Sequence, residues 1–293
     1  MSGGEAPGAR LRRVFSPGRQ GRPRLWTELA LIVIGYGLYS VTRDAVPSQK
    51  AVAIRRAGSV LRFEHRLHFD IELTINHAVD KVTPLIVGMN YYYATLHFLI
   101  TIGVLVWLYV RHPQAYRAER IVLFVVTVSS LVGFYFYALA PPRFLPGAGF
   151  INTVVTHHTW GSWGNSGVDS VSNQYAAMPS DHIAWSGWCG IMLYRYAGQR
   201  WIRIAGLLYP LFTLTVILAT GNHFVLDAVG GALNLGLAFG IRYAATRLWR
   251  RRAIAGALLP PPRTQHDGRG HEGALGEQRG VSDPETAVEQ RDG

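Results

Sequence analysis

Charge is scarce in this chain of 293 residues, of which 16% are Asp, Glu, Lys or Arg and 49% are hydrophobic. Soluble domains usually contain about 25% charged residues, so the shortage points to a membrane protein. The formal net charge is nevertheless +11, and Arg supplies most of it. Such a charge first suggests nucleic-acid binding. Because the Arg residues cluster between long apolar segments, membrane topology explains them better, and we expect no nucleic-acid partner.

Cysteine is almost absent as well. The single Cys189 excludes an intramolecular disulfide and, lying in an apolar segment, does not reveal the redox compartment. The sequence contains no internal repeat and no tight group of His, Asp and Glu with the spacing of metal ligands, so we expect neither a metal nor another cofactor. The Arg-rich tail is followed by a long apolar run without a small-residue cleavage site, and we therefore expect no cleavable signal peptide.

Long apolar runs are what the chain has in abundance. About 20 apolar residues cross a bilayer as a helix, and we predict six such spans, over residues 25–46, 84–110, 121–140, 180–196, 202–220 and 223–248. Segment 48–82 mixes apolar residues with Arg, Glu and Asp, which favours an amphipathic helix in the membrane interface; the alternative is a plain soluble helical connection. The predicted fold class is all-α, an integral membrane bundle of six transmembrane helices plus this interfacial helical segment.

The basic residues predict the orientation of the bundle. They gather in the N-terminal tail, in the connections after the second and fourth spans, and after the sixth span. The positive-inside rule puts all of these in the cytoplasm. We therefore predict disordered cytoplasmic tails at 1–24 and 253–293 around a six-span membrane domain at 25–252. Residues 141–179 and 220–223 then meet on the extracytoplasmic side.

Two polar islands at the ends of apolar runs are the candidate functional residues, because ionisable side chains are costly there. In the second island, His223 and Asp227 are four residues apart, a spacing that puts two side chains on one face of a helix. Asp227 then accepts a hydrogen bond from one imidazole nitrogen and leaves the other exposed as a nucleophile. A structural His–Asp pair near a helix start is the alternative.

In the first island, Ser180 is a good N-cap residue for a helix whose free N–H groups form an anion site. Capping and phosphate contact are both open for Ser180. His182 lies in the first turn, where it can protonate a leaving oxygen. Arg143 follows two prolines and offers a planar fork for phosphate oxygens; the alternative is an Arg that reaches lipid headgroups. A carboxylate at Asp181 is unfavourable beside a phosphate, so it either points away or pairs with an Arg from 48–82.

Over about residues 83–245 the chain resembles the type-2 phosphatidic acid phosphatase superfamily, and most closely the branch of fungal inositol phosphorylceramide synthase and its bacterial relatives. Three motifs in the same order carry the resemblance: Pro141-Pro142-Arg143; Asn173-Gln174-Tyr175-Ala176-Ala177-Met178-Pro179-Ser180-Asp181-His182; and Gly221-Asn222-His223 with Asp227. Two positions depart from the phosphatases, because Phe136 and Ile217 stand where those have phosphate-binding cations. The same losses are found in the headgroup-transferase branch, which favours that branch.

The resemblance implies a metal-free helical bundle that works through a phospho-histidine intermediate. His223 is then the nucleophile, Asp227 its orienting partner and His182 the general acid. The phosphate is held by Arg143, Ser180 and Asn222. Outside these motifs, we interpret Tyr93 and His97 as packing residues on one face of the second span, and His157 and His158 as solvated loop residues.

Our leading hypothesis is an integral cell-membrane phosphotransferase whose site faces the extracytoplasmic side. It moves a phosphoryl group or phospho-headgroup from a phospholipid or lipid-linked phosphate to the hydroxyl of a polyol or lipid alcohol. One alternative is a lipid phosphate phosphatase that hydrolyses phosphatidic acid or an isoprenyl (pyro)phosphate. Another is a non-catalytic lipid-binding or transport protein, against which the intact His182, His223 and Asp227 argue.

Overall fold

The computed structural model describes residues 50–159, 175 and 177–258, together with a few isolated positions between 23 and 37. Most of the first predicted span and nearly all of both predicted tails lie outside these residues. The chain divides into two compact units, Met1–Trp249 and Arg250–Gly293. Both polar islands belong to the first unit.

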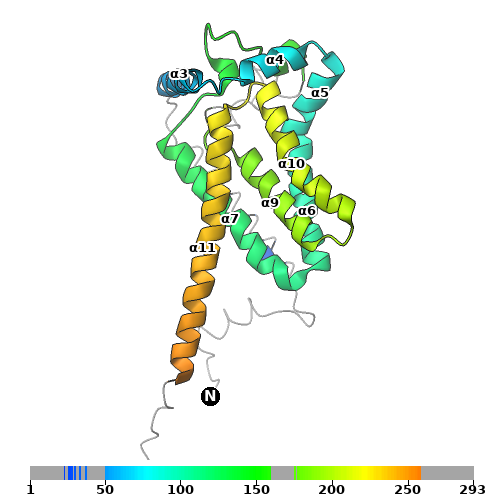
Figure 1. Ribbon diagram of the computed structural model, residues 1–293, viewed down its shortest axis with the longest axis vertical. Helices are drawn as coiled ribbons and strands as arrows, with labels where there is room; N and C mark the ends of the chain where they lie inside the picture. Colours follow the sequence, from blue (N-terminus) through cyan, green and yellow to red (C-terminus); the bar gives the residue numbers. More distant parts are fainter. Residues whose placement is uncertain are drawn as a thin grey trace, which may run out of the picture. The chain divides into compact units, whose positions relative to one another are not determined.

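Every regular element in the described part of the chain is helical (Figure 1). In chain order these are α3 (Lys50–Arg66), α4 (Glu72–Asp80), α5 (Thr83–Tyr91), the π-helix η1 (Tyr92–Leu96), α6 (His97–Arg111), α7 (Pro113–Phe136), the 3-10 turn η2 (Pro142–Phe144), α8 (Thr153–Thr156), α9 (Asp181–Tyr196), α10 (Arg200–Ala219) and α11 (Val225–Leu258). The all-α prediction is therefore confirmed for these residues.

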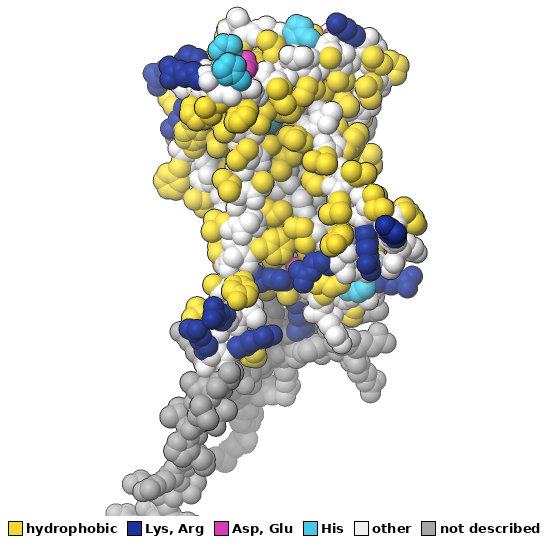
Figure 2. All heavy atoms as spheres, viewed as in Figure 1, with side chains coloured by type: hydrophobic (Ala, Val, Ile, Leu, Met, Phe, Trp, Pro, Cys, Tyr) yellow, Lys and Arg dark blue, Asp and Glu magenta, His cyan; other side chains and the backbone are white. Residues whose placement is uncertain are grey.

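Four helices are long and apolar enough to cross a membrane: Thr83–Arg111, Pro113–Phe136, Arg200–Ala219 and Val225–Arg251. They correspond to the second, third, fifth and sixth predicted spans. Figure 2 shows the same pattern on one face, where an apolar belt separates groups of basic side chains near its two ends. The predicted fourth span is α9, whose 16 residues reach about 24 Å, less than the roughly 30 Å of a hydrocarbon core. Six spans therefore remain a prediction.

The third predicted span begins earlier in the structure than the hydropathy suggests. Helix α7 starts at Pro113 and ends at Phe136, whereas the apolar run predicts 121–140. Proline is well tolerated at the first helical position, so Pro113 opens the helix and the charged turn that follows simply extends it. The chain after Tyr137 is extended: Leu139 donates its N–H to the carbonyl of Tyr175 at 2.8 Å and accepts from Ala177 at 3.2 Å. This pairing brings the two polar motifs on either side of the long loop together.

Helix α3 is amphipathic, as predicted for the interfacial segment. Its buried residues are Ala53, Ala57, Val60 and Glu64, which repeat at helical spacing along one face. That face packs on residues 138–140 and on Phe224, whereas its Arg side chains at 55, 62 and 66 are exposed. In Figure 1, α3 and α4 lie across the end of the bundle where α10 meets α11. The segment forms two helices rather than one.

Helix α9 is the centre of the packing. Trp188 and Met192 are fully buried in a cluster with Leu108 of α6 and Val122 of α7. Against α10 the backbones are in contact, because a Cβ added at Gly190 would lie 2.5 Å from the carbonyl oxygen of Gly206. A side chain at either glycine would force the two helices apart. This tight pair fixes the N-terminus of α9 beside the α10–α11 turn, where the polar islands lie.

Candidate active site

His223 lies in the turn between α10 and α11 and is buried, with 3% of its surface exposed. Its Nδ1 is 3.0 Å from the carbonyl oxygen of Ala177 and 3.4 Å from Oδ2 of Asp227. A carbonyl oxygen can only accept, so Nδ1 carries the hydrogen and Nε2 keeps its lone pair. Nε2 is buried and has no hydrogen-bond partner among the described residues. Ala177 thus shares with Asp227 the role of orienting the ring.

Asp227 does more than face His223. Its Oδ2 accepts the backbone N–H of Phe224 at 2.9 Å, so the side chain turns back and satisfies a free donor at the start of α11. The expected pairing of His223 with Asp227 is present, but its basis differs from the prediction. His223 precedes the first residue of α11, and the capping of the helix by Asp227, rather than a shared helix face, brings the two side chains together.

His182, in the first turn of α9, lies next to His223. The centroids of the two imidazole rings are 5.7 Å apart. The His182 ring stacks on Tyr93 at 4.1 Å and 11°, and its Nε2 donates to the Tyr93 carbonyl oxygen at 3.3 Å. Tyr93 belongs to the short π-helix η1, an irregularity that often occurs at functional sites. The sequence suggests only packing for Tyr93; in the structure its ring sets the orientation of His182.

Ser180 connects the two islands through its backbone. Its N–H donates to the carbonyl oxygen of Asp227 at 3.0 Å. The residue stands at the N-cap of α9, but its hydroxyl makes no capping hydrogen bond, so the expected side-chain cap is wrong. The buried Oγ has no partner in the described part of the chain. Capping and phosphate contact were the two roles open for Ser180. The structure lacks the capping bond and leaves the hydroxyl available for phosphate contact.

Arg143 is held against the same turn. Its backbone N–H donates to the carbonyl oxygen of Gly221 at 3.0 Å, and its guanidinium lies 4.8 Å from the centroid of the Phe144 ring. Gly221 has a φ of +64°, and a Cβ there would meet the Cβ of Arg143 at 3.3 Å. Glycine is needed for both reasons. The backbone of Arg143 is therefore joined to the turn two residues before His223.

Asn222 and Asp181 both make hydrogen bonds to neighbouring hydroxyl groups. Asn222 donates from Nδ2 to Oγ1 of Thr220 at 2.7 Å, which shapes the turn. Asp181 accepts a short hydrogen bond from Ser130 of α7, and Ser130 also accepts from Asn234 of α11 at 2.8 Å. Asp181 therefore points into the helix packing. Of the two expectations for this carboxylate, the one in which it points away is correct.

The two missing cations leave apolar side chains in their places. Phe136 is 72% exposed at the end of α7, and Ile217 is fully buried. Ile217 packs with Ile183, Leu218 and Ala228, while its carbonyl oxygen accepts the N–H groups of Asn222 and His223 at 3.1 and 3.3 Å. Ile217 thus holds the backbone of the turn through its carbonyl oxygen and contributes no charge to the site.

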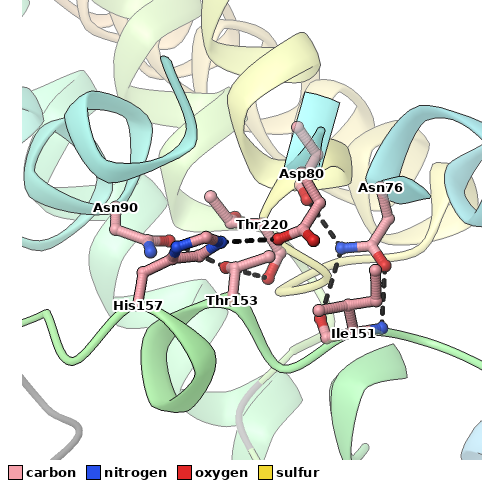
Figure 3. Close-up of polar contacts among 8 residues, drawn as sticks. Asn76, Asp80, Asn90, Ile151, Thr153, His157 and Thr220 are labelled. Atoms are coloured by element: carbon pink, nitrogen blue, oxygen red, sulfur yellow. Dashed lines mark hydrogen bonds and ion pairs between the residues drawn. The ribbon is translucent and has the colours of Figure 1, made fainter. Parts of the chain in front are cut away.

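A polar network ties residues 151–157, around α8, to the turn that carries His223 (Figure 3). Asn76 of α4 donates to the Ala219 carbonyl oxygen at 2.7 Å and accepts from the N–H of Ile151 at 2.8 Å. Thr153 donates to Asn90 of α5 at 2.9 Å. The prediction of a solvated His157 is wrong, because this half-buried ring is 2.7 Å from Oδ1 of Asp80. Residues 151–157 are therefore tied to α4, α5 and the turn that carries His223.

Among the described residues, no group of three or more His, Cys, Asp or Glu could hold a metal ion. Residues 58–241 match the family model described as the PAP2 superfamily. No curated protein and no solved structure matches the chain.

Proposed function

The chain belongs to the PAP2 superfamily, and from this premise we propose that it is a membrane phosphotransferase acting on lipid phosphates through a phospho-histidine at position 223. The observation that carries the proposal is the state of His223. Its Nδ1–H is directed to Ala177 and Asp227, and its buried Nε2 is available as a nucleophile. A phospho-histidine mechanism requires such a nitrogen.

In the first proposed step, Nε2 of His223 forms a bond to phosphorus while the bond from phosphorus to the leaving oxygen breaks. The electron pair stays on that oxygen, which takes a proton from His182. The ring centroid of His182 lies 5.7 Å from that of His223. Asp227 stabilises the positive charge that develops on the ring. In the second step a hydroxyl attacks phosphorus, loses its proton to His182, and the P–N bond breaks. Arg143 and the Ser180 hydroxyl hold phosphate oxygens in both steps.

Transfer and hydrolysis differ only in the acceptor of the second step. The apolar side chains of Phe136 and Ile217, where phosphatases have cations, favour the headgroup-transferase branch and an alcohol acceptor such as a polyol or lipid alcohol. Hydrolysis of phosphatidic acid or an isoprenyl (pyro)phosphate is the second candidate. Both products are measured in one assay, in which a lipid labelled on phosphorus is incubated with and without added alcohol.

An apolar cavity of about 480 Å³ beside the site supports a lipid substrate, since pockets for small ligands typically measure roughly 300–1,000 Å³. Its lining includes Ser59 and Phe63 of α3, Tyr137 after α7, and Leu226 of α11. Pro179 and Leu226, which precede Ser180 and Asp227 in the sequence, also line the cavity and place it beside the elements that carry the site. At its rim, Arg62 donates to Oγ of Ser59 at 2.9 Å. A hydrocarbon chain in the cavity complements its apolar lining.

Replacing Ser59 with Trp tests this position of the hydrocarbon chain. The indole fills the rim of the cavity and excludes several methylenes, each worth about 0.8 kcal/mol on burial. We expect kcat/KM for a long-chain phosphatidic acid to fall at least about tenfold, while a short-chain analogue keeps its wild-type value. Ala51→Trp, at an exposed position of α3 that does not line the cavity, is the matched control. Equal long-chain activity in both variants would place the hydrocarbon chain elsewhere.

We propose that the site faces the extracytoplasmic side, with both termini in the cytoplasm. Cys189 is buried, so impermeant thiol reagents have little background. Thr156 is exposed near the site, and Gln199 is exposed in the α9–α10 connection at the other end of the bundle. In intact cells we expect labelling of Thr156→Cys only; Gln199→Cys should react only after lysis. The reverse pattern would overturn the orientation.

A further inference from the structure

Two carboxyl groups are buried beside the catalytic turn, and no ion pair joins either of them to a basic side chain among the described residues. Glu64 near the end of α3 and Glu72 at the start of α4 both have 0% of their surface exposed. Burying an unpaired charge is costly unless the group is neutralised or hydrogen-bonded. Neither residue belongs to the motifs that define the proposed mechanism. Their position therefore calls for a reason other than the chemistry at phosphorus.

Glu64 caps the helix that follows His223. Its Oε1 accepts the backbone N–H of Leu226 at 2.6 Å, across 162 residues of sequence. This N–H is in the first turn of α11, where the donors have no acceptor within the helix. Asp227 accepts the N–H of Phe224 in the same turn. One carboxylate from within the helix and one from α3 thus fix the backbone that carries His223 and Asp227.

The side chain of Glu72 lies next to that of Glu64. The remaining oxygen of Glu64 and both oxygens of Glu72 have no hydrogen-bond donor among the described residues. Two adjacent carboxylates repel each other unless one of them holds a proton that the other accepts. Burial, with Glu72 next to it, raises the pKa of Glu64 from 4.5 to about 9, although the Leu226 N–H opposes the rise. Burial likewise raises the pKa of Glu72.

The other charged groups that act on the pair have the same sign. Asp227 of α11 acts on both carboxyls, and Asp70, in the turn between α3 and α4, acts on Glu72. Asp70 is itself paired with the exposed His65 at 2.7 Å. A second negative charge on the pair would therefore meet repulsion from two directions. The arrangement is stable only with one proton retained.

We propose that Glu64 and Glu72 are positioning residues that share one proton, clamp the first turn of α11 and thereby hold His223 in its reactive orientation. Loss of the shared proton at alkaline pH releases the clamp. The effect on turnover rests on the proposed function, but the clamp itself does not. The sign is that of a raised pKa: the stabilisation is complete below about pH 4.5 and is lost as the pH rises towards about 9.

The variants Glu64→Gln and Glu64→Leu distinguish the capping hydrogen bond to Leu226 from the titration of the shared proton. The amide of Gln still accepts from Leu226 and donates to Glu72, so it keeps the clamp but does not titrate. Leu removes the capping acceptor. Asp80→Asn is the matched control, because this carboxyl of α4 pairs with His157 and not with α11. For each variant, Tm in detergent and the kcat and KM for a short-chain lipid phosphate are measured between about pH 6 and pH 10, a range that brackets the raised pKa.

We expect the Tm of the wild type and of Asp80→Asn to fall as the pH rises from about 6 to about 9, and their kcat to fall as the pH passes about 9, while Glu64→Gln keeps both nearly constant. At about pH 7, Glu64→Leu should lose at least about tenfold in kcat with little change in KM. An alkaline fall in the Tm of Glu64→Gln equal to that of the wild type would overturn the proposal. A wild type that turns over no lipid phosphate would contradict the proposed function instead, and the Tm profiles would still decide on the clamp.

Discussion

Replacing His223 with Asn should reduce the turnover of a lipid phosphate by about 10⁴-fold or more, because the bond to phosphorus is made by its Nε2. Asn fits the space and retains an amide that can face the Ala177 carbonyl oxygen, which is 3.0 Å from Nδ1 in the wild type. It offers no nucleophilic nitrogen. The loss should therefore appear in kcat, with a KM near that of the wild type.

The matched control for this substitution is His158→Asn. His158 is an exposed histidine that follows α8, with a φ of +49°, a conformation that Asn tolerates. We expect wild-type activity from it, and a Tm within a few degrees of the wild type for both variants. Turnover by His223→Asn within about tenfold of the wild type, in a folded protein, would exclude His223 as the nucleophile.

The second large effect is expected at His182, and it should depend on the leaving group. His182→Asn removes the proposed general acid, whose contribution is on the order of 10²–10⁴ in rate. An alkyl alcohol needs the proton to leave, so phosphatidic acid should lose activity by this factor. An aryl phosphate with an acidic phenol, such as p-nitrophenyl phosphate, leaves without it and should lose less than about tenfold.

The same variant distinguishes proton donation from mere packing. His182 stacks on Tyr93 at 4.1 Å between ring centroids, so Tyr93→Leu serves as the control in which the ring loses its support but keeps its nitrogen atoms. That control should lower activity on both substrates by a similar factor. If His182→Asn also lowered both equally, the residue would be structural.

Much of the site follows from the sequence because short-range geometry determines it. The polar island at 220–227 forms a turn and a helix start, and the capping of α11 by Asp227 brings its carboxylate to His223. The contact between His182 and His223 follows from topology, since both islands end on one face of the bundle. The long second and fifth spans, at Thr83–Arg111 and Arg200–Ala219, could be predicted for a simpler reason: each is one apolar run.

The rest depends on contacts between distant segments. The Ala177 carbonyl oxygen reaches His223 across 46 residues, which include the whole of α9 and α10, and no periodicity reveals that contact. The π-helix η1, which places Tyr93 on His182, is equally unpredictable from composition. Glu64 could have been found, because an acidic residue on the apolar face of an amphipathic helix is expensive without a purpose. Asp181 could not, since its partner Ser130 is one of several hydroxyls on α7.

The central claim is a covalent intermediate on His223, and the stereochemistry at phosphorus tests it most directly. A lipid phosphate made chiral at phosphorus with oxygen isotopes, or with sulfur and oxygen isotopes for hydrolysis, is converted by the wild-type enzyme and the product is analysed by phosphorus NMR. Each in-line displacement inverts the configuration. Attack by His223 followed by attack of the acceptor predicts net retention; net inversion would show a single direct displacement and contradict the phospho-histidine mechanism.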